Sequence, residues 1–278
     1  MKNEISRRDF IKTSAAVAGA GGLLSLPACG EDGIQFAIPM GVMNSLGSMT
    51  FASTRAEYNS STNDTHTAWV KTSGERIRDV VKDTEGRRVN GFAWEFELFK
   101  DNTINAWCMP GARIAFYDGI IPLCQNPAGV AIVMGHEIAH AVCNHGGQRM
   151  AQRLAVQLGV TTLSAMLDRL ADPDDSVKNI ALQVFGVTAA LGGELAVLAY
   201  SRKHEREADK LGLIYAAKAG YDPNEAPGFW ERMSKLGGGG PEFLSTHPTS
   251  TSRAKALREA IPEAEKYKPA GGWTNGGH

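Results

Sequence analysis

A long hydrophobic stretch lies between Asn126 and Met150, in the segment NPAGVAIVMGHEIAHAVCNHGGQRM. Asn126 is suited to cap a helix, and Pro127 is suited to its first turn. Gly146-Gly147 indicates where this helix breaks or kinks. Between these points hydrophobic residues occupy almost every side of the helix rather than one stripe, which is the pattern of a buried helix.

The pattern upstream of this helix predicts another helix and a small sheet. From about Asn63 to Lys82, hydrophobic residues recur at helical spacing. Residues 92–98 alternate with the period of a half-buried strand, and Asp101-Asn102 is expected to turn the chain. Residues 104–109 then return, and residues 113–117 add a third strand. With a mostly helical C-terminal half, this predicts an α+β fold in which a three-stranded sheet packs on the buried helix.

The rest of the chain divides by composition. With 278 residues and 43% hydrophobic content, it is long enough for one domain with a sizeable core. We expect the folded domain to cover residues 61–268. Residues 29–60 are rich in Gly, Ser, Thr and Met and are expected to form a tether, and residues 269–278 a flexible tail.

Two further hydrophobic segments allow alternative interpretations. Residues 154–167 and 180–200 are hydrophobic enough to suggest membrane contact, but Gln183 and Glu194 interrupt the longer segment. We interpret both segments as buried helices of a soluble domain. The alternative is that they belong to an oligomer surface or a membrane-facing surface.

The buried helix carries the most informative motif, HEIAH, at residues 136–140. Residues four apart share a helix face, so His136 and His140 can reach one metal ion, while Glu137 can deprotonate a metal-bound water. Buried polar groups without partners cost several kcal/mol, and a metal would supply those partners. The motif therefore predicts a catalytic zinc site rather than a hydrogen-bonded cluster in the core.

A catalytic zinc normally has three protein ligands, so one more is needed. The pattern HExxHxxGxxH is excluded, because this chain has Cys143 and Gly146 where Gly and His would be required. Further along, in YSRKHEREADKLG, Glu205 and Asp209 are four apart on a predicted helix. Glu205 is the candidate ligand, and His204 points about 100° away from it. The alternative is a charged helix face exposed to water.

HEIAH followed by SRKHEREAD resembles the HtpX and CAAX-prenyl-protease type zinc endopeptidases, a gluzincin family that includes a mitochondrial quality-control protease. NAWCMPGARIAFYDGII resembles the family's Asn-Ala-x-x-x-Pro-Gly strand, and THPTSTSR resembles its His-Pro-x4-Arg segment. The resemblance covers about residues 60–265 and is strongest to soluble periplasmic members of the BepA and LoiP type. It implies a zincin-like peptidase domain with one Zn²⁺ per chain.

The resemblance also implies roles for individual residues. His136, His140 and Glu205 correspond to the zinc ligands and Glu137 to the general base. Asp209 corresponds to a residue that accepts a hydrogen bond from the outer N–H of a ligand histidine and so fixes the orientation of that ring.

His247 has a less definite counterpart in the family. The resemblance implies that it is a catalytic residue that stabilises the oxyanion, or one that holds the site latent. Its alternative role is structural, at the start of a helix before Pro248. His145 is expected to be structural or to support a ligand rather than to bind the metal.

The N-terminus contains two export signals. Residues 6–12, SRRDFIK, fit the twin-arginine export pattern, and a short Gly/Ala-rich stretch follows them. Leu26-Pro27-Ala28-Cys29 resembles a lipobox, which makes residues 1–28 a lipoprotein signal peptide and Cys29 the lipidated residue. The alternative is an ordinary cleaved signal. We therefore expect a periplasmic protein that is lipid-anchored to the membrane of the cell envelope.

Charge and cysteine content limit the other possibilities. The chain has 29 Lys and Arg against 30 Asp and Glu, so we expect no nucleic-acid partner, which would require a basic patch. Cys108, Cys124 and Cys143 permit one disulfide with one thiol, or no disulfide.

Three functions fit these patterns. The first is a zinc endopeptidase whose substrates are unfolded or misassembled envelope proteins. The second is a chaperone or assembly factor for outer-membrane proteins with a latent peptidase site. The third, hydrolysis of a non-peptide amide such as a cell-wall bond, is disfavoured by the family features. The sequence does not determine the oligomeric state.

Overall fold

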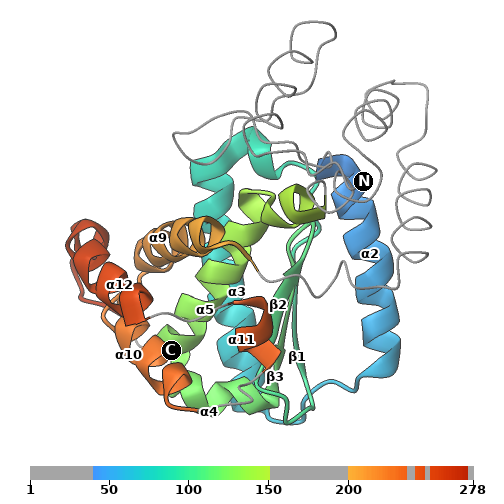
Figure 1. Cartoon of the computed structure of the whole chain (residues 1–278), viewed down its shortest axis with the longest axis horizontal. Helices are drawn as coiled ribbons and strands as arrows, with labels where there is room; N and C mark the ends of the chain where they lie inside the picture. The colour runs from blue at the N-terminus through green and yellow to red at the C-terminus, as the bar shows by residue number, and fades with distance from the viewer. Residues whose placement is uncertain (1–39, 151–199, 237–241, 248–250, 275–278) are drawn as a thin grey trace, which may run out of the picture.

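The computed structural model describes residues 40–150, 200–236, 242–247 and 251–274. The α-helices are α2 (Met40–Glu57), α3 (Asp64–Glu85), α4 (Ile121–Cys124), α5 (Pro127–Val142), α9 (Arg202–Lys218), α10 (Glu225–Ser234), α11 (Glu242–Thr246) and α12 (Thr251–Ala264). The strands are β1 (Glu95–Phe99), β2 (Ala106–Met109) and β3 (Arg113–Tyr117), and the 3-10 helices are η1 (Gly86–Val89), η2 (Asp118–Ile120) and η4 (Glu265–Tyr267). The predicted fold class, mostly helical with a small three-stranded sheet, is confirmed (Figure 1).

The strand order in the sheet is β1-β3-β2, with β3 parallel to β1 and antiparallel to β2. As predicted, residues 106–109 return against the direction of β1 and residues 113–117 form a third strand. The order of the strands, with β3 between the other two, was not predicted. Every residue of β3 is buried, whereas β1 and β2 each include half-buried residues. A strand that is hydrophobic on both faces favours the centre of a sheet, where both faces are covered.

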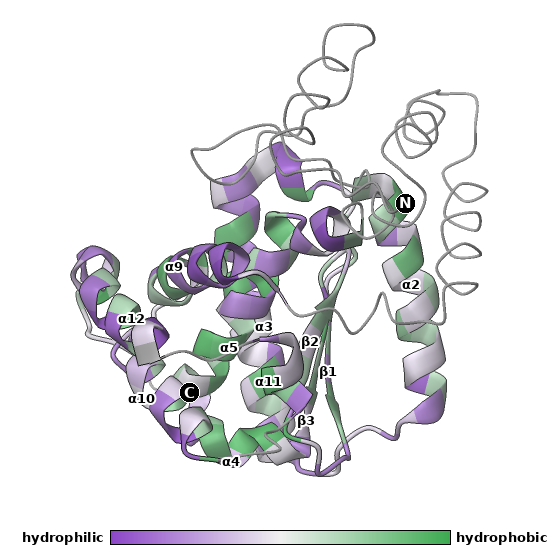
Figure 2. Ribbon diagram, viewed as in Figure 1, coloured by the Kyte–Doolittle hydropathy of each residue, from purple (hydrophilic) through white to green (hydrophobic). Residues whose placement is uncertain are grey.

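Helix α5 is the predicted buried helix. The Asn126 side chain accepts a hydrogen bond from the N–H of Gly129, Pro127 lies in the first turn, and all 16 residues are buried. Helices α3, α9 and α10 and strand β2 contact it, and its hydrophobic colouring is visible in Figure 2. The helix ends earlier than predicted. Asn144 adopts a φ of 51°, which interrupts the helix before Gly146, and residues 145–150 are helical again.

Helix α2 corrects the prediction of a tether over residues 29–60. Residues 40–57 form a helix that lies across the sheet from α3 and α5 (Figure 1). Phe51 is buried against Trp107 of β2, with ring centroids 5.8 Å apart. Hydrophobic side chains such as Val42, Met43 and Leu46 are also buried, although the segment's Gly and Ser content had suggested no core contact.

The predicted flexible tail also differs from the structure where it is described. Thr274 forms a backbone bridge with Tyr221, its N–H donates to the carbonyl of Gly220, and Trp273 packs against the core. Residues 154–167 and 180–199 lie outside the described residues. None of the described helices is long and hydrophobic enough to span a bilayer.

Helices α5 and α9 cross at two glycines. A Cβ on Gly135 would lie 2.5 Å from the carbonyl oxygen of Gly212, and a Cβ on Gly212 would lie 2.5 Å from the amide nitrogen of His136. The two backbones are therefore closer than any other residue type permits. This close crossing brings the SRKHEREAD helix directly onto the HEIAH helix.

We expect Gly135→Ala to lower the free energy of unfolding by about 1–3 kcal/mol, because the added methyl must push α9 away from α5. Urea denaturation of the full chain would measure this. The control is Gly146→Ala, whose Cβ would meet only the Met43 side chain at 3.7 Å. Equal stability of the two variants would contradict the packing argument.

Candidate metal centre and active site

The helical spacing of HEIAH brings its two histidines together. The Nε2 atoms of His136 and His140 are 3.1 Å apart, and both side chains are buried. Glu137, also buried, lies on the same helix beside them. The predicted sharing of one face by His136 and His140 is therefore what the structure shows.

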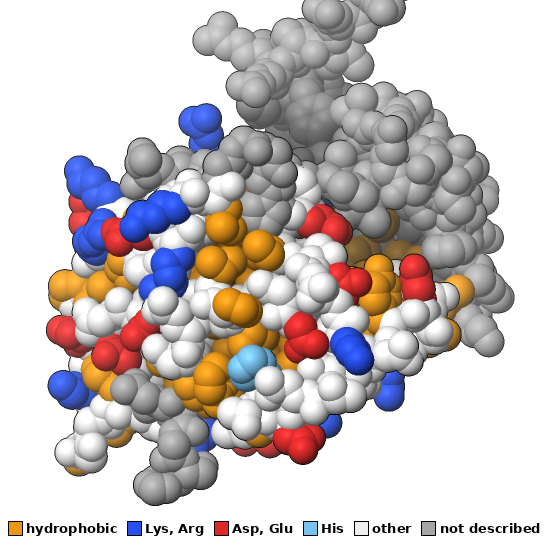
Figure 3. Space-filling model, turned by 90° about the horizontal axis from the view of Figure 1, so that it is seen from below, with side chains coloured by type: hydrophobic (Ala, Val, Ile, Leu, Met, Phe, Trp, Pro, Cys, Tyr) orange, Lys and Arg blue, Asp and Glu red, His pale blue; other side chains and the backbone are white. Residues whose placement is uncertain are grey.

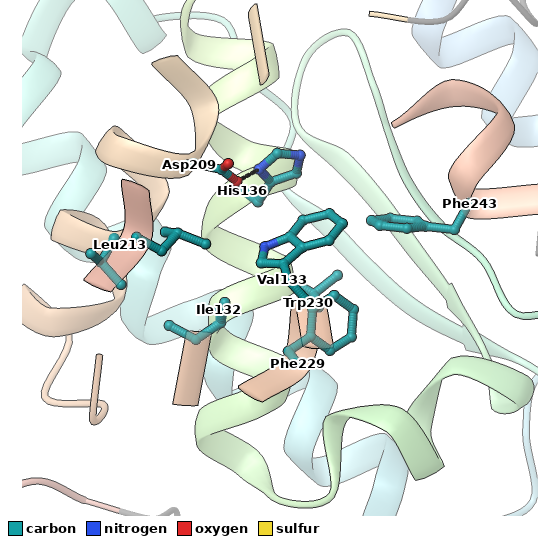
Figure 4. A pocket seen from close by; sticks show the side chains of 9 residues that line it. Ile132, Val133, His136, Asp209, Leu213, Phe229, Trp230 and Phe243 are labelled. Carbon is teal, nitrogen blue, oxygen red and sulfur yellow. Dashed lines mark ion pairs between the residues drawn. The ribbon is translucent and has the colours of Figure 1, made fainter. Parts of the chain in front are cut away.

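Helix α9 adds a carboxylate to this pair. The Ser201 side chain caps the helix by accepting a hydrogen bond from the N–H of His204, and Glu205 follows in the first turn. Its Oε1 lies 3.4 Å from His140 Nε2, and its Oε2 lies 3.6 Å from His136 Nε2. One turn later, Asp209 Oδ1 lies 3.1 Å from His136 Nδ1, on the far side of that ring (Figure 4).

His247 lies at the same point, although it is 107 positions from the end of the HEIAH motif along the chain. Its Nδ1 lies 3.2 Å from His136 Nε2 and 3.1 Å from Glu205 Oε1. Its Nε2 lies 3.3 Å from Glu137 Oε1. The ring stacks on Phe243, with centroids 4.5 Å apart, and the His247 N–H donates to the Phe243 carbonyl. His136, His140, Glu205 and His247 thus each direct one possible ligand atom into a common space.

Sequence reasoning did not identify the role of Arg253. Its Nε and Nη2 donate to the two carboxylate oxygens of Asp209 at 2.8 and 2.6 Å, and its Nη1 pairs with Glu205. The guanidinium also lies over the Trp230 ring, 3.6 Å from the centroid. Arg253 is the last residue of the His-Pro-x4-Arg segment. The motif therefore pointed to this arginine, but it did not indicate that Asp209 and Glu205 are its partners.

Tyr200 was likewise not identified. Its ring stacks on His140 with centroids 3.7 Å apart, and its N–H donates to the carbonyl of Thr246, the residue before His247. The Arg149 guanidinium lies over the Tyr200 ring, 3.5 Å from its centroid. No spacing rule relates Tyr200 to His140, so only the folded chain reveals this contact.

Burial and charge act in opposite directions on the carboxylates. Burial raises the pKa of Glu137, against the opposing effect of His247 and His136. Burial also opposes ionisation of Glu205 and Asp209. Even so, neighbouring histidines hold the pKa of Glu205 below its usual range, and Arg253 and His136 do the same for the pKa of Asp209. Three buried carboxylates therefore share this site with one buried guanidinium, and a divalent cation would balance the excess negative charge.

The orientations of the two HEIAH histidines also fit a metal. His136 Nδ1 faces Asp209, and His140 Nδ1 faces His145 Nδ1 at 2.9 Å. If both Nδ1 atoms carry the proton, both Nε2 atoms direct lone pairs into the same space. A cation between the lone pairs would stabilise such an arrangement, and two histidines with one glutamate are one of the ligand sets that hold catalytic zinc.

A small pocket adjoins His136 and Asp209. Figure 4 shows Trp230, Phe229 and Val133 forming its hydrophobic wall, below the contact between His136 and Asp209. These side chains keep the back of the His136 ring in a dry environment, which strengthens its contact with Asp209.

The cysteines are not among the four residues whose donor atoms converge in this site. Within the described residues, Cys108, Cys124 and Cys143 form no disulfide with one another, which corresponds to the second of the two alternatives above. Burial raises the pKa of Cys108 and Cys124, so neither is an activated thiolate. Cys29 lies outside the described residues.

Comparison with protein families identifies the class of this chain. Residues 65–261 match the sequence model of peptidase family M48, and the chain belongs to that family. This range includes all the residues of the site described above. Residues 4–23 match the signal sequence of the twin-arginine translocation pathway, which indicates export across the cytoplasmic membrane.

Individual relatives are named as metalloendopeptidases or proteases. The chain is 35% identical over 175 residues to mitochondrial metalloendopeptidase OMA1 of Schizosaccharomyces pombe, which covers 62% of this chain and 48% of the relative. It is 33% identical over 193 residues to human mitochondrial metalloendopeptidase OMA1, covering 67% and 36%. It is 28% identical over 181 residues to the beta-barrel assembly-enhancing protease of Yersinia pestis, covering 63% and 35%. The chain thus matches about half or less of each relative's length.

We expect Arg253→Met to lower the free energy of unfolding by about 3–5 kcal/mol, because it leaves two buried carboxylates without their cation. Chemical denaturation of the full chain at constant pH would measure this. Arg258→Met is the control on the same helix, because Arg258 pairs with Glu231 at the surface and should contribute at most about 1 kcal/mol. A loss at Arg253 no larger than at Arg258 would contradict the prediction.

Proposed function

We propose that this chain is a zinc-dependent endopeptidase. The observation that carries this proposal is the convergence of His136, His140 and Glu205 with Glu137 beside them, all within the range that matches peptidase family M48. His136, His140 and Glu205 would hold the zinc, and Asp209 would orient His136 from behind. Bound there, a zinc ion supplies Lewis acidity, which polarises a peptide carbonyl and lowers the pKa of water.

In this proposal Glu137 acts as the general base. It is buried and adjoins the donor cluster, and burial raises its pKa, which brings its basicity closer to that needed near neutral pH. The carboxylate would accept a proton from the attacking water and return it to the leaving amine. Residues of this chain thus provide both the metal site and the proton carrier.

The sheet suggests how a peptide would be held. Strand β2 lies at one edge of the described sheet and contacts α5, which carries the HEIAH motif. An extended substrate could add to this edge by backbone hydrogen bonds. Such binding depends little on side chains, which suits an enzyme that acts on varied unfolded segments.

The proposed site of action is the bacterial cell envelope. The twin-arginine signal supports export to the periplasm, and the name of the Yersinia relative, a beta-barrel assembly-enhancing protease, supports envelope proteins as substrates. Within the proposal, Cys29 anchors the mature chain to a membrane by lipid, and misfolded or misassembled envelope proteins are degraded or trimmed.

The absence of a nucleic-acid partner remains a prediction. On the face of the molecule in Figure 3, Lys and Arg side chains lie among Asp and Glu side chains, around a group of hydrophobic side chains. This mixture, over the part of that face that is described, is unlike a continuous basic patch.

We expect Glu137→Gln to retain one zinc per chain and to lose at least about a hundredfold in cleavage of unfolded casein or outer-membrane protein, because amide nitrogen and oxygen cannot accept the proton. Metal content by elemental analysis and cleavage by gel would be measured on the same preparations. A wild-type chain that folds without binding zinc would contradict the proposal. Full activity of Glu137→Gln with zinc bound would contradict the role of Glu137.

A second candidate function is a chaperone or assembly factor whose peptidase site is normally latent. The position of His247 favours it, because Nδ1 lies among the three proposed ligand atoms and could occupy the fourth position. A zinc site needs an open position for catalysis, so a fourth protein ligand would suppress cleavage.

If His247 holds the site latent, we expect His247→Ala to raise the cleavage rate severalfold while zinc remains bound. If it stabilises the oxyanion instead, the same variant should lose about 10²–10³ in kcat. Single-turnover cleavage with zinc content measured in parallel distinguishes the two. Glu137→Gln in the His247→Ala background is the control, because it should cleave in neither case.

A further inference from the structure

His145 is buried beside the proposed metal centre but is not one of its donors. It is fully shielded from solvent, and it lies five residues after His140, past the break in the helix. Its Nδ1 is 2.9 Å from His140 Nδ1, and its Nε2 is 3.4 Å from Glu207 Oε2. Both ring nitrogens therefore face specific partners.

The contact between the two Nδ1 atoms constrains where protons lie. At 2.9 Å one nitrogen must donate and the other must accept. If His140 binds metal through Nε2, its proton is on Nδ1, and His145 Nδ1 is the acceptor. The proton of a neutral His145 is then on Nε2, where it points to the carboxylate of Glu207.

The surroundings of His145 hold its ring in this orientation. The His204 ring stacks on it, with centroids 4.3 Å apart and an angle of 19° between the rings. His204 Nε2 lies 3.0 Å from Gln148 Oε1, and Gln148 Nε2 donates to the carbonyl of Cys143 at 2.9 Å. Because Gln148 holds His204 in place and His204 stacks on His145, the His145 ring has little freedom to rotate.

We propose that His145 and Glu207 are positioning residues, which form a chain from His140 through His145 to Glu207 that fixes the proton and orientation of the metal-binding His140. The inference rests on the proposed function, since it requires a metal on His140. Helix α9 then supports both HEIAH histidines. Asp209 contacts His136 directly, and Glu207 acts on His140 through His145.

A competing interpretation is a second metal site. Cys143, His145 and Glu207 place one possible ligand atom each within 4.8 Å of one another. A metal on His145 Nε2 would require the His145 proton to be on Nδ1, where it would donate to His140 Nδ1. The His140 proton would then move to Nε2 and oppose metal binding there. The two sites are incompatible, and the geometry favours the positioning chain.

The test measures metal affinity rather than activity. In the full chain, we expect His145→Leu and Glu207→Leu each to weaken zinc binding about 10- to 100-fold in a chelator competition assay. His145→Gln should recover part of this loss, because its amide oxygen can accept the His140 Nδ1–H. The double variant His145→Leu/Glu207→Leu should lose little more than His145→Leu alone, because both residues act through one chain.

Two controls separate this effect from general damage. Glu75→Leu removes an exposed carboxylate on α3 and should leave zinc affinity unchanged. The absorption bands of the cobalt-substituted protein should shift in His145→Leu, since they report ligand geometry directly. Because the Glu207 side chain is 16% exposed, Glu207→Leu should fold even if His145→Leu does not.

The outcomes are distinct for each proposal. If the wild-type chain binds no zinc, the proposed function fails. If it binds one zinc and both Leu variants bind equally tightly, the positioning chain is overturned while the proposed function stands. Two zinc ions per wild-type chain, falling to one in Cys143→Ser, would also overturn it in favour of the second site.

Discussion

The close crossing of α5 and α9 at Gly135 and Gly212 is the constraint on which the rest of the site depends. Glu205 lies within 3.6 Å of both HEIAH histidines because the two helices nearly touch. A side chain at either glycine would hold the helices apart. Where the backbones meet, one turn of α9 places Glu205 beside the Nε2 atoms of His136 and His140. The next turn places Asp209 beside His136 Nδ1. The same contact between the two helices thus determines both the packing of the core and the distances between the site residues.

This arrangement places an unusual amount of charge in the interior. Glu137, Glu205 and Asp209 are each more than 90% buried, and Arg253 is the buried cation that faces them. Such a cluster costs free energy unless each charge is paired, so Arg253 stabilises the fold as well as the site. Aromatic rings complete the enclosure. Tyr200 stacks on His140, Phe243 stacks on His247, and Trp230 lies under Arg253. In these dry surroundings, each remaining polar contact is stronger than it would be in water.

Much of the fold and site was predictable because it depends on local periodicity. The cap at Asn126, the burial of α5 and the shared face of His136 and His140 all follow from residues within a few turns of one helix. The order of the strands did not follow, since β3 enters between β1 and β2 only because both of its faces can be covered. Helix α2 was missed for a related reason. Its few hydrophobic side chains are buried by the sheet, and a Gly- and Ser-containing segment does not reveal that partner.

The sequence by itself determined which chemistry is available. HEIAH and SRKHEREAD place candidate metal donors, a candidate base and a third carboxylate at helical spacing, and residues 4–23 carry a twin-arginine export signal. Tertiary structure alone decided how these groups meet and what surrounds them. His247, Arg253 and Tyr200 reach the site from segments at least 60 positions beyond the end of HEIAH, and His145 lies between His140 and Glu207, in contact with both. The physical reason is that spacing along a helix fixes relations only within that helix. Contacts between segments depend on which surfaces can pack closely enough to exclude water.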